Sequence, residues 1–193
     1  MNTSDDTRRN FLRTFAIGTA GVASSVATVA SAKSVINKGA EEIIEFRRSF
    51  GYLWSRIASY TVEVANAMPE EHYDFKPVPE VRSFKEEMLH LANSDFWINN
   101  YFGEGKGTGS DYEASGKSKA DCVRLVESSF EHMSGLISGL SDADLKTRVD
   151  TFAGEMTRMD VLWFMRDHIT HHRAKLVASL RLKGITPPSY VGS

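Results

Sequence analysis

Apolar side chains recur every three or four residues in four segments of the chain, a spacing that places them on one face of an α-helix. The segments span about 40–68, 84–102, 118–140 and 158–183. The apolar positions predicted to be buried are Ile43, Phe46, Phe50, Trp54, Ile57, Val64 and Met68; Phe84, Met88, Leu91, Ile98 and Phe102; Val123, Val126, Phe130, Met133, Ile137 and Leu140; and Leu162, Met165, Ile169, Leu176 and Leu180.

Start and stop signals flank these segments. Pro69 ends the first helix because proline cannot donate a backbone hydrogen bond. Gly184 stands at the position where a glycine commonly follows the C-terminus of a helix. No strand-like alternation is evident in the sequence. The pattern therefore predicts an all-α fold, an antiparallel four-helix bundle. A glycine-rich linker or lid is expected over 103–117, and another connection over 141–156. The predicted N-cap pairs are Ser83 with Glu86, Ser118 with Asp121, and Thr157 with Asp160.

The first 32 residues differ from the rest of the chain. Arg8 and Arg9 precede a weakly apolar run over 15–29, and the small residues Ala30 and Ala32 follow it. This order is typical of a cleavable signal, and the arginine pair is typical of the twin-arginine type. We therefore expect a signal peptide over 1–32 and a mature domain over 33–193. The protein is then exported by the twin-arginine machinery to the periplasm or another extracytoplasmic space. An ordinary Sec signal, or an uncleaved signal that tethers the protein to the membrane, is the alternative.

Composition narrows the function classes. The chain has 193 residues, of which 41% are hydrophobic and 25% charged, as in a soluble globular protein. Its net charge of −2 gives no reason to expect a nucleic-acid partner. The single cysteine, Cys122, excludes an intrachain disulfide and a cysteine-rich zinc site.

Three histidines lie within five residues of the fourth predicted helix. His168 and His172 are four residues apart, so both lie on one face, at or inside the apolar stripe, while His171 points toward solvent. Histidines at this spacing commonly supply two ligands to a metal ion. The other interpretation is a pair of core histidines that bond to polar neighbours. The segment is not a zincin motif, because Ile169 stands where that motif has a glutamate.

A third ligand has to come from another helix, and His90 is the candidate that remains by elimination. His72 lies in a proline-rich connection and His132 on a polar face. The helical wheel places His90 about 120° from the apolar stripe of its own helix, so its direction stays open. Glu87 and His90 form a Glu-x-x-His pair, but no second such pair follows, so a di-iron centre is not expected.

The segments 83–92, 167–173 and 180–188 together resemble the DinB-like superfamily of metalloenzymes. That resemblance implies an up-down-down-up four-helix bundle and one divalent metal ion (Zn, Ni, Fe or Mn) held by His90, His168 and His172. It also implies a possible homodimer. The sequence departs from the common family pattern at 173–175, which reads Arg-Ala-Lys where many members have Arg-Gly-Gln. Export is a second departure, since most members are cytoplasmic.

Three imidazole ligands leave a divalent ion with open positions, which is typical of catalytic sites. The expected function is a metal-dependent hydrolase or transferase that acts on a small molecule, with Glu86 or Glu87 as the candidate acid–base group. The first alternative is a non-enzymatic bundle with a structural ion. The second is a thiol-dependent S-transferase, as for some members of the family, which export disfavours.

Overall fold

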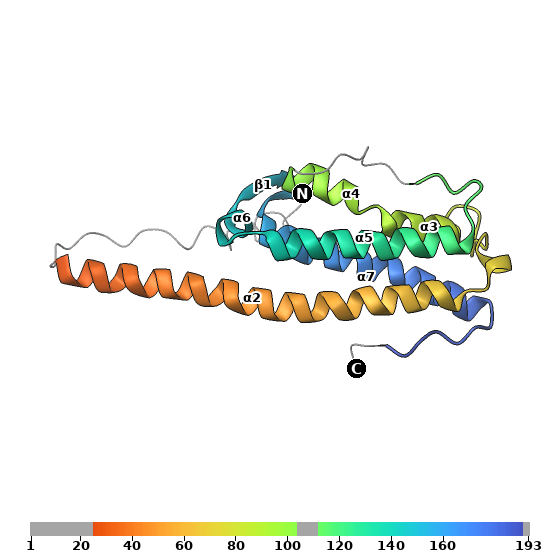
Figure 1. Ribbon diagram of the computed structural model, residues 1–193, viewed down its shortest axis with the longest axis horizontal. Coiled ribbons are helices and arrows are strands. Elements are labelled where there is room, and N and C mark those ends of the chain that lie inside the picture. Colours follow the sequence, from red (N-terminus) through yellow and green to blue (C-terminus); the bar gives the residue numbers. More distant parts are fainter. Residues whose placement is uncertain (1–24, 104–111, 191–193) are drawn as a thin grey trace, which may run out of the picture. The chain divides into compact units, whose positions relative to one another are not determined.

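The computed structural model describes residues 25–103 and 112–190, without the side chains of 25–37 and 94–95. The chain divides into two compact units after Glu42, and the second unit contains the fold described below. The described part is all-α apart from one short hairpin (Figure 1). The elements are α2 (Ser25–Ala67), η1 (Glu70–His72), α3 (Phe84–Ala92), α4 (Ser94–Trp97), η2 (Ile98–Phe102), α5 (Lys119–Gly139), α6 (Asp142–Lys146), β1 (Arg148–Thr151), β2 (Gly154–Thr157) and α7 (Arg158–Leu182).

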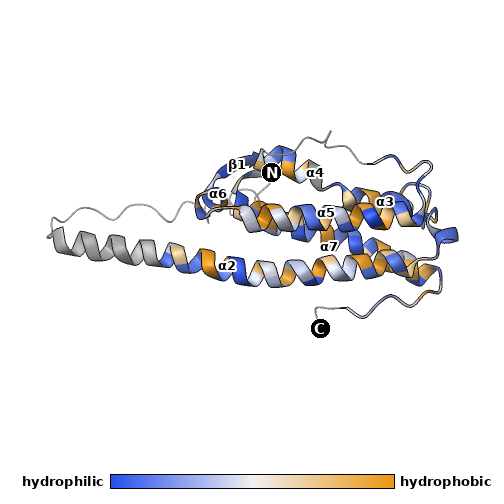
Figure 2. Ribbon diagram, viewed as in Figure 1, coloured by the Kyte–Doolittle hydropathy of each residue, from blue (hydrophilic) through white to orange (hydrophobic). Residues whose placement is uncertain are grey.

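The core forms where the apolar faces of the helices meet. Apolar and polar positions alternate around α2, α5 and α7 (Figure 2). The helix α3 lies against both α5 and α7. Large aromatic side chains connect α2 to the other helices: the Trp54 ring lies 5.3 Å from Phe130, and Phe50 lies 5.0 Å from Trp163. Full burial of a side chain such as Phe50, which is 1% exposed, contributes about 1.5–3 kcal/mol.

The second predicted helix is broken, which the sequence prediction missed. The helix α3 ends at Ala92, because the backbone of the next residue, Asn93 (φ −78°, ψ 65°), is not helical. The Asn93 side-chain oxygen then accepts a hydrogen bond from the Phe96 amide at 3.4 Å, as an asparagine at a helix start does. The five residues that follow α4 form a π-helix, which ends at Gly103 with φ +75°. The break leaves His90 in the last turn of α3.

A β-hairpin occupies residues that we expected to be a plain connection. The strands β1 and β2 are antiparallel, with Arg148 opposite Thr157 and Thr151 opposite Gly154. Gly154 has φ +109°, a conformation that other residues rarely adopt. Each strand has four residues, so the alternation was too short to recognise. The hairpin leads directly into α7 and so fixes where that helix begins.

The predicted helix signals are confirmed. Capping boxes are present at Ser83, Ser118 and Thr157. Gly184 follows α7 with φ +73°, as expected for a glycine beyond a helix C-terminus.

The described residues do not test the predicted N-terminal signal. Residues 1–24 of the proposed signal over 1–32 lie outside the described part of the chain. The helix α2 begins at Ser25, earlier than the start near residue 40 that the sequence predicted. Within the described residues, no helix combines the length and the apolar content that a membrane span requires.

Candidate metal centre

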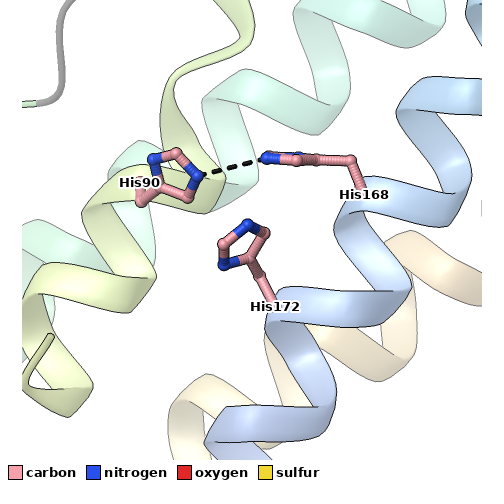
Figure 3. Close-up of side chains that lie close together, drawn as sticks. All are labelled: His90, His168 and His172. Atoms are coloured by element: carbon pink, nitrogen blue, oxygen red, sulfur yellow. Dashed lines mark hydrogen bonds between the residues drawn. The ribbon is translucent and has the colours of Figure 1, made fainter. Parts of the chain in front are cut away.

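The structure brings His90, His168 and His172 together. Each ring offers one nitrogen such that all three nitrogens lie within 4.8 Å of one another. The centroid of the His90 ring lies 5.0 Å from that of His168 and 4.4 Å from that of His172. The centroids of the His168 and His172 rings are 4.3 Å apart. Figure 3 shows one ring from α3 facing two rings from α7.

The helical spacing of α7 explains how two of these rings come to face one point. His168 and His172 lie one turn apart on the same side as the buried residues of the helix. His172 is 7% exposed, whereas His171 points outward and is exposed. Neither His72 nor His132 joins the group, as the sequence predicted.

The direction of His90 follows from the two neighbours of its helix. Because α3 packs against both α5 and α7, two of its faces are covered. The main apolar stripe occupies one face, and His90 lies on another, toward α7 (Figure 3). A single-stripe wheel cannot represent a helix with two packed faces, so the sequence could not place this ring.

The spacing of the facing nitrogens fits a shared metal ion. His90 Nε2 and His168 Nε2 are 3.1 Å apart. Two nitrogens bound to one tetrahedral ion at about 2.05 Å lie about 3.3 Å from each other, close to the observed separation. A direct N–H···N hydrogen bond gives the same distance, so the distance alone is compatible with both arrangements.

A buried carboxylate orients His172. Glu87 Oε1 lies 2.5 Å from His172 Nδ1, and the Glu87 side chain is only 5% exposed. A histidine that donates Nδ1–H to a carboxylate keeps its Nε2 lone pair for a metal, the arrangement usual behind metal-bound histidines. The sequence suggested Glu87 as an acid–base group, but its partner is a ring 85 residues away.

The charge of Glu87 is balanced by cations. Lys175 Nζ lies 3.3 Å from Oε1, and Arg82 Nη1 lies 3.7 Å from Oε2. Burial alone raises the pKa of the Glu87 carboxyl, but the hydrogen bond to His172 and the charges of His172 and Lys175 outweigh burial and lower that pKa overall. Glu87 is therefore an anion that accepts from His172 at neutral pH.

The environment of His168 keeps its imidazole neutral. Burial, followed by the nearby His172, His90 and His171 rings, lowers the pKa of His168 to about 4. A neutral imidazole has the lone pair that a metal ion requires. Trp97 covers one side of the ring, with the centroids 5.3 Å apart. Within the described residues, the buried Nδ1 of His168 has no hydrogen-bond partner.

Glu86, the other suggested acid–base group, has a structural role. Its Oε2 accepts from the Ser83 amide at 2.6 Å and pairs with Lys76 Nζ at 3.0 Å. These contacts close the capping box of α3 and lower the pKa of Glu86. Glu86 therefore holds the start of the helix that carries His90.

Comparison with known proteins agrees with this picture. A model of the DinB superfamily matches residues 53–176, which include all three histidines. A comparison with curated proteins gave no match. A DinB-like protein from Bacillus cereus is similar in structure, with a TM-score of 0.61, 23% identity, and coverage of 74% of this chain and 96% of the other. A DinB-like protein from Bacillus subtilis gives a TM-score of 0.56, 22% identity, and coverage of 69% and 90%. These two show the fold, and the family match, which extends over more than half of the sequence, shows that the chain belongs to the DinB superfamily.

Proposed function

We propose that the protein binds one divalent metal ion through His90, His168 and His172 and acts with it on a small molecule, as a hydrolase or transferase. The observation that carries the proposal is the convergence of three imidazoles from two helices. Within the described residues, no further histidine, cysteine or carboxylate completes the group. Three protein ligands leave a position open for a reacting molecule, the property that separates catalytic from structural metal sites.

The residues around this site orient the ligands and line it with aromatic side chains. Glu87 fixes the His172 ring, and Lys175 holds Glu87 in its charged form. A crevice of about 10 Å³ is lined by His90, His168, Trp54 and Trp97, a volume at the lower limit of the room that one water molecule needs. When bound, Zn, Ni, Fe or Mn would supply a Lewis acid beside this crevice, since imidazole ligands suit all four.

Metal analysis tests the proposal. Protein recovered from its native compartment should contain about one equivalent of metal, because three neutral imidazoles favour a single ion. A His168→Ala/His172→Ala variant should contain none. His132→Ala is the matched control, because His132 is exposed on α5 outside the group, and it should keep the metal. A wild-type protein without bound metal would falsify the proposed function.

A structural ion is the second candidate, because the histidines connect α3 to α7 and could hold the two helices together. The two candidates differ in the response of the melting temperature to a chelator. A structural ion predicts that chelation unfolds the protein or lowers its melting temperature strongly. A catalytic ion predicts a small decrease, since the buried apolar contacts remain.

We also propose that α2, α3 with α4, α5 and α7 form an up-down-down-up bundle. In Figure 1, α2 and α7 end where α3 and α5 begin, which supports this topology. Export as a periplasmic protein through the twin-arginine machinery, with cleavage after Ala32, remains a proposal that rests on the sequence of the first 32 residues. A mature N-terminus at Lys33, found by mass spectrometry, would support the proposed cleavage. Homodimer formation is likewise a proposal, and sedimentation of the mature protein tests it.

A further inference from the structure

A groove of about 670 Å³ lies between the end of α7, the start of α3 and the connection that precedes α3. This volume falls within the range of about 300–1,000 Å³ that is usual for small-molecule sites. The apolar residues that line the groove are Pro77, Val81, Phe84, Leu176, Ala178 and Leu182. The groove is therefore large enough for a small molecule and offers it an apolar surface.

The apolar lining continues from the core to the surface. Phe84 and Leu176 are each 1% exposed, so they form a fixed floor. Val81 and Leu182 are 43% and 64% exposed, although both are large apolar residues. Exposed apolar side chains that gather around one groove, instead of being scattered, are typical of a binding surface.

The charged residues of the lining neutralise one another. Two acids, Glu80 and Glu87, stand against two bases, Arg82 and Lys175, so the lining has no net charge. Both bases are already paired with Glu87, because Lys175 Nζ lies 3.3 Å from Oε1 and Arg82 Nη1 lies 3.7 Å from Oε2. Glu80 is exposed, and an ion pair in water contributes little. A charged ligand would therefore give up water without finding a free, buried counter-charge.

The hydroxyl groups of the lining are also in use. Ser83 Oγ accepts a hydrogen bond from the Glu86 amide at 3.1 Å, as part of the capping box of α3. Ser179 Oγ donates to the Lys175 carbonyl at 3.0 Å. Ser83 and Ser179 are only 3% and 4% exposed. The surface that remains available to a ligand is therefore mainly apolar.

We propose that this groove binds an uncharged, largely apolar small molecule. The molecule lies on the floor formed by Phe84 and Leu176, between the exposed side chains of Val81 and Leu182. The proposal goes beyond the proposed function, because none of the three clustered histidines lines the groove.

Fluorescence titration of the full chain with N-phenyl-1-naphthylamine, an uncharged apolar probe, tests the groove. We expect saturable binding of one probe molecule per chain, with chelator and with added zinc alike. Decanol, decanoate and decyltrimethylammonium have the same apolar tail and differ in charge. Decanol should displace the probe, whereas the two charged competitors should do so about tenfold less well, because each brings a charge that the groove leaves unpaired.

Two pairs of matched variants locate the bound probe. Ala174 and Ala178 are both exposed on α7, but only Ala178 lines the groove, so Ala178→Trp fills it and Ala174→Trp does not. Leu182→Glu places a charge at the rim, and Ile44→Glu does so on α2, where Ile44 is 67% exposed. Ala178→Trp and Leu182→Glu should each weaken probe binding about tenfold, or about 1.4 kcal/mol. The other two variants should bind the probe as the wild type does, and circular dichroism checks that all four are folded.

The outcomes for groove and metal centre are separable. Absence of saturable binding, displacement by a charged competitor as strong as by decanol, or an equal loss in the Ala174 and Ala178 variants overturns the groove proposal, even if one equivalent of metal is present. Dimers that dissociate in Ala178→Trp during sedimentation, without probe binding to the wild type, would show that a second copy covers the groove and would also overturn the proposal. Probe binding that depends on Ala178 and Leu182 in a protein that never binds metal supports the groove and overturns the metal centre.

Discussion

Individual side chains determine whether the three histidines can act as ligands. His172 and Glu87 are both more than nine-tenths buried, so each group hydrogen-bonds to the other instead of to water. A buried carboxylate without a partner would cost several kcal/mol, and a histidine without one would be free to rotate. This pair therefore fixes ring orientation in a way that an exposed ion pair could not.

Substitution of Glu87 should weaken metal binding while leaving the protein folded. Glu87→Gln keeps the shape of the side chain but loses the charge that favours the Nδ1–H form of His172. We expect the metal dissociation constant to increase about 10–100-fold, the usual effect of losing such a partner. Competition with a chromogenic chelator measures this constant.

Glu86→Gln is the matched control for that prediction. Glutamine can close the same capping box, and the polar contacts of Glu86 go to Ser83 and Lys76 instead of to the histidines. Its metal affinity should equal that of the wild type. Equal affinities in the Glu86 and Glu87 variants would show that Glu87 has no special role.

The thiol of Cys122 should be unreactive in the folded protein. Its side chain is 0% exposed, and burial raises the pKa of the thiol, so the reactive thiolate is scarce near neutral pH. Ellman's reagent should modify Cys122 only after guanidinium unfolds the chain. Rapid modification of the native protein, with a Cys122→Ser variant as the blank, would contradict this burial.

At the scale of elements, the start of α7 connects the hairpin to the histidine pair. The Thr157 hydroxyl accepts from the Asp160 amide at 3.1 Å, and Asp160 Oδ2 accepts from the Thr157 amide at 3.0 Å. This capping box satisfies backbone donors that would otherwise lack a partner in the helix. The helix that carries His168 and His172 therefore begins at a defined residue.

Removal of this cap should destabilise the protein. Thr157→Ala should lower the free energy of unfolding by about 1 kcal/mol, as typical N-cap losses do. Urea denaturation followed by circular dichroism measures the difference. Thr186→Ala changes an exposed threonine beyond α7 and should have little effect. A stability for Thr157→Ala equal to that control would mean that the cap contributes nothing.

Sequence patterns predicted those elements that have one buried face. The stripe of α7 and the positions of His168 and His172 followed from helical periodicity. The break at Asn93 was missed because the apolar spacing continues through it, although asparagine is a frequent capping residue. The hairpin was missed because an alternation over only four residues is too short to recognise in the sequence. The contact between Glu87 and His172 joins distant helices, and local periodicity carries no signal for it. Metal ligation itself stays a prediction.

For the whole molecule, the family match and the histidine cluster involve only part of the chain. The superfamily model begins at residue 53, well after the proposed signal, so membership in the family does not depend on export. The cluster of three histidines lies within the second compact unit and involves no residue before Ile43. Export can thus be tested without altering the proposed metal centre.

Export should depend on the arginine pair. An Arg8→Lys/Arg9→Lys variant retains the positive charge but loses the pair that the twin-arginine route recognises. We expect this variant to accumulate inside the cell, whereas the wild type reaches the extracytoplasmic fraction. Immunoblots of cell fractions measure both. Unchanged export of the variant would indicate the Sec pathway instead.

The place of Glu87 on α3, three residues before His90, has a mechanical consequence. The helix that supplies one ring of the cluster also holds a ring of α7 in place, because Glu87 Oε1 lies 2.5 Å from His172 Nδ1. A shift of α3 along α7 would therefore displace the His90 ring and release the His172 ring in the same movement. The geometry of the cluster thus depends directly on how these two helices pack.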